Sequence, residues 1–96
     1  MAVAAGASAA ADPEARADRS KLCERVANMA VEMNRARKEG VPQRRVEAAA
    51  LAETDDIQVG GALVGVAQVV YAMAEDIDST VRSRVRRDCR SGFRPR

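Results

Sequence analysis

The chain has no histidine and no tryptophan, and its only aromatic residues are Tyr71 and Phe93. Without histidine it lacks the commonest general base and the commonest metal ligand, and it can form no Ser-His or Cys-His nucleophile pair. These absences favour a non-enzymatic protein that needs neither a metal nor a cofactor. The shortage of aromatic side chains also removes the residues that bury the most area in a small core.

Large aliphatic side chains are scarce too, because 20 of the 45 hydrophobic residues are alanine. A chain of 96 residues forms one domain at most. We expect a single helical domain over residues 12–91, a low-complexity leader over residues 1–11 and a basic tail over residues 92–96. A core this poor in large side chains needs an additional restraint, for which a disulfide is the simplest candidate.

The leader, MAVAAGASAAA, has no large side chain that could dock onto a core, and we expect it to be disordered. It lacks the basic and strongly hydrophobic stretches of an intact secretory signal. Its small residues before Asp12 nevertheless resemble the region ahead of a signal-peptidase cleavage site. We hypothesise that it is the remnant of a signal in a longer precursor.

Start and stop signals predict two helices in the first half of the domain. The first begins with a cap at Asp12 and ends at Gly40, a left-handed cap ahead of Pro42. Its apolar stripe consists of Leu22, Val26, Met29, Ala30 and Met33. The second helix runs from Pro42 to about Glu53, and Thr54, Asp55 and Asp56 offer caps for the next element.

The segment Ile57–Ala74 is the most apolar part of the chain. A membrane span, a pair of strands and a central helix are the alternatives. The length is marginal for a span and polar alternation is missing, so we favour a helix buried on most of its circumference. Gly61 and Gly65 share one face, which would approach either the first helix or a second copy of the chain, making a homodimer possible.

The last helix should begin near Asp78, Ser79 or Thr80. Val81, Val85 and Cys89 then point inward on its one apolar stripe. In an up-down-up-down arrangement the end of this helix returns to the start of the first, where Cys23 borders the apolar stripe. We therefore predict an all-α bundle of three to four helices, stapled by a disulfide between Cys23 and Cys89.

The carboxylates fall into two groups, Asp55-Asp56 and Glu75, Asp76 and Asp78. Neither group has the spacing of a calcium loop, and both precede a predicted helix, so we interpret them as helix-start carboxylates. The glycines form no phosphate-binding loop. The sequence therefore predicts no catalytic residues and no metal site.

Charge is unevenly distributed, because residues 79–96 contain seven Arg against Asp88, a net charge of +6, while residues 1–78 carry −4. We predict a partner-binding surface on the last helix, consisting of Arg82, Arg86, Arg87 and Arg90. Arginine favours planar contacts with carboxylate or phosphate. An acidic protein partner fits this cluster better than nucleic acid does, since stacking aromatics are missing apart from Phe93.

The chain resembles a family of small exported proteobacterial proteins over roughly residues 20–90. The resemblance rests on Cys23 opening a helix, the break RKEGVP at 37–42, Tyr71, the Asp78-Ser79-Thr80 cap and the terminal Cys89. It implies export and a bond between Cys23 and Cys89. In size and cysteine count the chain is also similar to periplasmic acid-stress chaperones and periplasmic immunity proteins.

These observations predict a protein-binding module of the bacterial envelope, periplasmic or secreted, acting as an inhibitor, an immunity protein or a chaperone. One alternative is a cytoplasmic, prophage-type regulator that binds nucleic acid, or a machine acting on it, through the arginines. The other is a structural or membrane-associated protein that packs through residues 57–74.

Overall fold

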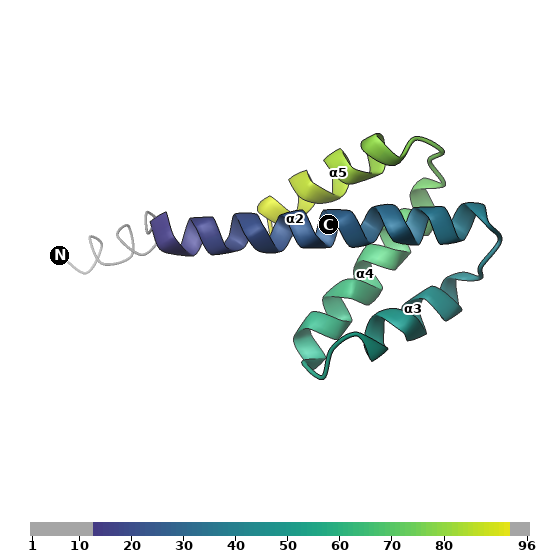
Figure 1. Ribbon diagram of the computed structural model, residues 1–96, viewed down its shortest axis with the longest axis horizontal. Coiled ribbons are helices and arrows are strands. Elements are labelled where there is room, and N and C mark those ends of the chain that lie inside the picture. Colours follow the sequence, from purple (N-terminus) through teal and green to yellow (C-terminus); the bar gives the residue numbers. More distant parts are fainter. Residues whose placement is uncertain (1–12, 93–96) are drawn as a thin grey trace.

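The computed structural model describes residues 13–92, and every regular element within them is an α-helix. The helices are α2 (Pro13–Lys38), α3 (Gln43–Ala52), α4 (Ile57–Met73) and α5 (Asp78–Arg90). Successive helices run in opposite directions, so the predicted all-α up-down bundle is confirmed (Figure 1). The predicted leader, the predicted cap at Asp12 and residues 93–96 of the basic tail lie outside the described residues.

Helix α2 forms the long axis of a molecule that measures 55 × 28 × 24 Å. Helix α5 lies along one side of α2, and the hairpin of α3 and α4 lies along another (Figure 1). Helix α3 packs mainly on α4, which crosses α2 and makes little contact with α5. Because of this layout, α2 is the element that joins the two parts of the bundle.

The turn between α2 and α3 is the one that the sequence predicts. Gly40 has a φ of +92°, the left-handed conformation that glycine adopts without strain. Its N–H donates to the carbonyl of Arg37, and the N–H of Val41 donates to the carbonyl of Ala36, both at 3.0 Å. This pair of bonds closes the end of α2 and turns the chain directly into α3.

Two helix starts differ in how they are capped. Asp56 caps α4 as predicted, since its Oδ1 accepts from the N–H of Gln58 at 2.9 Å and of Val59 at 3.2 Å. Helix α5 begins at Asp78, as predicted, but none of Asp78, Ser79 and Thr80 caps it, because the N-cap is Ile77. The side chain of Glu75 accepts from the N–H of Ile77 at 3.0 Å, and Asp78 is free to bind α2.

The buried surface of α2 is wider than the predicted stripe. Val26, Ala30 and Met33 are buried as predicted, but Leu22 is 44% exposed, and its assignment to the core is wrong. The difference arises because α2 packs against α5 on one side and against α4 on another. Leu22 faces neither of these helices closely enough to be buried. The residues that the stripe leaves out are Cys23, Ala27, Val31 and Asn34, all buried.

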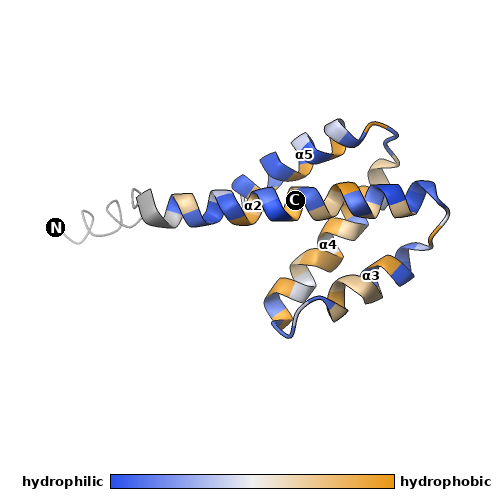
Figure 2. Ribbon diagram, viewed as in Figure 1, coloured by the Kyte–Doolittle hydropathy of each residue, from blue (hydrophilic) through white to orange (hydrophobic). Residues whose placement is uncertain are grey.

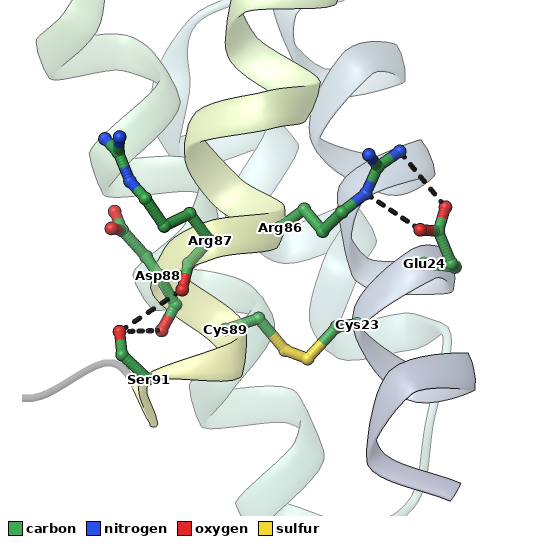
Figure 3. The surroundings of a disulfide bond; sticks show 7 residues. All are labelled: Cys23, Glu24, Arg86, Arg87, Asp88, Cys89 and Ser91. Carbon is green, nitrogen blue, oxygen red and sulfur yellow. Dashed lines mark hydrogen bonds and ion pairs between the residues drawn. A yellow bond between two sulfur atoms is a disulfide. The ribbon is translucent and has the colours of Figure 1, made fainter. Parts of the chain in front are cut away.

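A disulfide and small side chains hold α5 against α2. Val81 and Val85 are fully buried in α5, and Ala27 is fully buried in α2. The sulfur atoms of Cys23 and Cys89 are 2.10 Å apart and the two Cα atoms are 5.6 Å apart, which confirms the predicted disulfide (Figure 3). Because the bond joins residues 66 positions apart, it closes most of the domain into one loop.

We expect the double variant Cys23→Ala, Cys89→Ala to be less stable than the wild type by about 4 kcal/mol, the chain-entropy value for the 66-residue separation. Urea unfolding followed by circular dichroism measures this difference. A thiol reductant should destabilise the wild type by a similar amount and leave the double variant unchanged. An unfolding free energy of the wild type that does not respond to the reductant would contradict the prediction.

Helix α4 is hydrophobic along nearly its whole length (Figure 2) but is buried on one face only. The buried residues are Gly60, Leu63, Val66, Ala67 and Val70. The prediction that most of its circumference is buried is therefore wrong, and Ile57 at its start is 89% exposed. The reason is the position of α5, which packs on α2 and leaves the outer face of α4 without a covering helix.

Candidate protein-binding groove

Helices α2 and α3 meet at the turn and then diverge (Figure 1), and side chains of both helices line a groove between them. Since α3 packs on α4 more than on α2, Met29 and Ala36 between α2 and α3 are only partly buried and Ala49 is exposed, whereas Met33, Val46 and Ala50 are buried at the base. The groove has a volume of about 250 Å³. It is lined by Met29, Glu32, Met33, Ala36, Val41, Arg45, Val46, Ala49, Ala50 and Glu53. We call it the α2–α3 groove.

Tyr71 fixes the closed end of the groove. Its hydroxyl, on α4, donates to the carbonyl of Val41 in the turn at 2.5 Å. Burial raises the pKa of Tyr71, and the nearby guanidinium of Arg37 opposes this change. The phenol therefore stays protonated and keeps donating at neutral pH, which ties the turn to α4 and positions α3 relative to α2.

The interior of the α2–α3 groove is apolar and adaptable. Met29 and Met33 line it from α2, and Val46 and Ala50 line it from α3. Methionine side chains are flexible and adjust to different apolar surfaces. Pockets for drug-sized molecules measure roughly 300–1,000 Å³. At about 250 Å³, the groove suits one or two apolar side chains of a protein better than a whole small molecule.

Three charged residues stand at the edges of the α2–α3 groove. Glu32 lies on α2, and Arg45 and Glu53 lie at opposite ends of α3. All three are exposed, and within residues 13–92 none has an ion pair or a side-chain hydrogen bond. These charges are therefore available to a partner.

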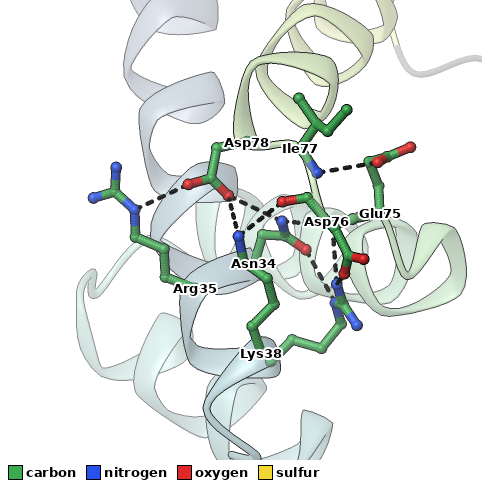
Figure 4. Close-up of polar contacts among 8 residues, drawn as sticks. Asn34, Arg35, Lys38, Glu75, Asp76, Ile77 and Asp78 are labelled. Carbon is green, nitrogen blue, oxygen red and sulfur yellow. Dashed lines mark hydrogen bonds and ion pairs between the residues drawn. The ribbon is translucent and has the colours of Figure 1, made fainter.

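A separate cluster of polar residues joins the end of α2 to the loop between α4 and α5 (Figure 4). Asn34 is fully buried and donates to the carbonyl of Glu75 at 2.8 Å and to Asp78 Oδ1 at 3.1 Å. Arg37 also donates to the Glu75 carbonyl, at 2.9 Å. The buried amide and the loop thus satisfy each other's hydrogen-bonding groups.

Asp78 is the centre of this polar cluster. Its carboxylate lies 3.2 Å from Arg35 Nε and 3.1 Å from Lys38 Nζ. Hydrogen bonds from Asn34, Lys38 and Arg35 lower the pKa of Asp78 to about 2, against a smaller opposing effect of burial. The sequence signal for this contact, missed in the prediction, is the run of basic residues in the last turn of α2, which matches the acidic loop in charge.

The carboxylates of the loop serve the fold, because those of Asp76 and Asp78 bind α2 and that of Glu75 binds the N–H of Ile77. In the part of the chain that the structure describes, no group of three or more His, Cys, Asp or Glu is arranged to hold a metal ion. Glu75, Asp76 and Asp78 are engaged by the backbone of the loop and by the basic residues of α2.

The four arginines predicted to bind a partner divide into two pairs, and Figure 3 shows one residue of each, Arg86 directed at Glu24 and Arg87 directed away from it. Arg86 Nε lies 2.8 Å from Glu24 Oε2 on α2, and Arg82 donates to Asn28 on the same helix. These two residues help to hold α5 in place. Arg87 and Arg90 are exposed and have no ion pair among the described residues, so only they remain free for a partner.

Gly61 and Gly65 face open space. A Cβ atom built on either residue would have no neighbouring atom within 4 Å, so the face is not packed against α2. Gly60 makes the close contact instead, since a Cβ atom there would lie 3.0 Å from Cδ2 of Leu51. Of the two sequence-based alternatives for the Gly61 and Gly65 face, a second copy of the chain stays a prediction.

Comparison of the chain with protein-family models, with curated proteins and with solved structures gives no match. Among the described helices, none combines the length and the hydropathy needed to cross a membrane.

The contacts of Asp78 predict a loss of stability in acid. Because its pKa is lowered from 3.8 to about 2 on folding, its stabilising effect is fully present above about pH 4 and is lost as the pH falls toward 2. We expect the free energy of unfolding to decline over this window, and to decline less in Asp78→Asn. Urea unfolding across the window measures both slopes.

Asp55→Asn is the matched control, because Asp55 is exposed and has no side-chain partner among the described residues. It should retain the wild-type slope. Equal slopes for Asp78→Asn and the wild type would contradict the role given to Asp78.

Proposed function

We propose that the chain is a non-enzymatic protein-binding module that receives apolar side chains of its partner in the α2–α3 groove. One observation carries this proposal: α3 packs on α4, so a groove stays open between α2 and α3, with half-buried Met29 and exposed Ala49 in its lining and buried Met33 at its base. An apolar groove between helices is one of the recurrent ways in which a protein receives the apolar side chains of a partner. The charged side chains around Asp78 bind one another across α2 and the loop, so they are engaged in holding the fold together. Their engagement supports a binding role over a catalytic one.

We further propose that the protein acts in an oxidising compartment, the bacterial periplasm or the medium outside the cell. The bond between Cys23 and Cys89 supports this location, because disulfides persist in such compartments and are rare in the cytosol. Within it, an inhibitor, an immunity protein and a chaperone all use a binding surface of this kind.

Arg87 and Arg90 support a second contact, with an acidic part of the same partner. Both lie near the C-terminal end of α5, on its exposed side. A regulator that binds nucleic acid needs a broader basic surface, since affinity for a phosphate backbone grows with the number of cationic contacts. The engagement of Arg82 and Arg86 with α2 therefore favours protein over nucleic acid as the partner.

Two adjacent alanines provide a matched test of the proposed function. Ala48 and Ala49 are both exposed on α3, but only Ala49 lines the α2–α3 groove. With a photo-crosslinking amino acid at position 49, the oxidised protein should form an adduct with a partner in an extract of its native compartment. The same amino acid at position 48 should form far less.

The partner identified in this way is then purified and its affinity measured by calorimetry. Ala49→Leu fills the groove and should weaken binding at least tenfold, whereas Ala48→Leu should bind like the wild type. Equal crosslinking at the two positions, or equal affinity of the two leucine variants, would contradict binding through the groove.

A further inference from the structure

The charges around the α2–α3 groove indicate what kind of partner segment it accepts. Resting on the function proposed above, we propose that the groove binds an amphipathic helix whose apolar side chains enter between α2 and α3 and whose Lys or Arg residues pair with Glu32 and Glu53. The proposal depends on three properties of the groove: its shape, the absence of a sheet edge in residues 13–92 and the charges at its edges.

The shape of the groove favours a helix over an extended peptide. An extended peptide binds either by main-chain hydrogen bonds to a free sheet edge or, as polyproline II, in a groove lined by aromatic side chains. Residues 13–92 contain no strand, and no aromatic residue lines the groove. The groove presents mainly side chains, among them Met29, Met33 and Val46. A helix satisfies its own main-chain groups internally and needs only apolar side chains, spaced three or four residues apart, to fill such a surface.

The edges of the groove select for positive charge. Glu32 and Glu53 are exposed carboxylates without a partner in the described part of the chain, and they lie on the two helices that form the groove. A lysine or arginine beside the apolar anchors of the bound helix can reach them, whereas an acidic residue there is repelled. Exposed ion pairs contribute little individually, so the two together should change affinity by about tenfold.

Arg45 gives the bound helix an orientation. It lies near the turn that closes the groove, while Glu53 lies at the opposite end of α3. The positive side chains of the partner should therefore lie toward the open end, and an acidic or uncharged residue should lie beside Arg45. A helix with this order of charges fits in one direction only.

Two fluorescein-labelled synthetic peptides test the inference with the full, oxidised chain. Both have leucine at the same positions on one face of a helix, and the other face carries lysine in one peptide and glutamate in the other. By fluorescence anisotropy, the lysine peptide should bind at least tenfold more tightly. Ala49→Leu should weaken its binding at least tenfold, and Ala48→Leu should not.

Charge reversal provides the specific control. Glu32→Lys, Glu53→Lys should remove the preference for the lysine peptide or invert it. Glu39→Lys, Asp55→Lys changes the net charge by the same amount at exposed positions outside the groove, and it should keep the preference. Circular dichroism and a thiol count establish that each variant is folded and oxidised.

Each other outcome overturns the inference in a recognisable way. If both peptides bind equally and Ala49→Leu weakens both, the groove accepts apolar helices of any charge, and the proposed function survives without this inference. If neither peptide binds, or if Ala49→Leu binds the lysine peptide as tightly as the wild type does, the groove is not a site for such helices. If the protein alone sediments as a dimer that Ala49→Leu dissociates, a second copy is the occupant.

Discussion

The contact between α2 and α5 is the interaction on which the rest of the structure depends. Helix α5 makes little contact with α4, so it is held almost entirely by α2. Val81 and Val85 belong to the same buried cluster as Val26 and Ala30 of α2, and the bond between Cys23 and Cys89 fixes the far end. A chain so rich in alanine buries little area per residue, so a covalent link that contributes about 4 kcal/mol is a large share of its net stability.

The open surfaces of the molecule follow from this contact. Since α5 occupies one side of α2, the hairpin of α3 and α4 must pack on another, where α4 fills most of the space. Tyr71 then ties the turn between α2 and α3 to α4, and the polar cluster around Asp78 ties the loop between α4 and α5 to α2. What remains uncovered is the α2–α3 groove, so the site is a consequence of how few side chains this chain has to fill the gap.

Features that depend on nearby residues could be predicted from the sequence. Features that depend on which pairs of helices pack together could not. The disulfide, the turn at Gly40 and the cap at Asp56 depend on residues near one another or on simple topology. The exposure of Leu22 depends on helix packing, because periodicity identifies an apolar face without saying what covers it. For the same reason Met29 and Met33 are recognisable as apolar, but the groove between α2 and α3 becomes visible only in the structure.

The methyl groups of three methionines offer the most direct test of the groove as the binding site. Met29 and Met33 line it, whereas Met73 lies on α4 outside it. In carbon-13 NMR spectra of methyl-labelled, oxidised protein, addition of the leucine–lysine peptide should shift the signals of Met29 and Met33 and leave that of Met73 in place. A shift of Met73 alone, or saturable binding of the peptide with no shift at Met29 and Met33, would contradict binding in the α2–α3 groove.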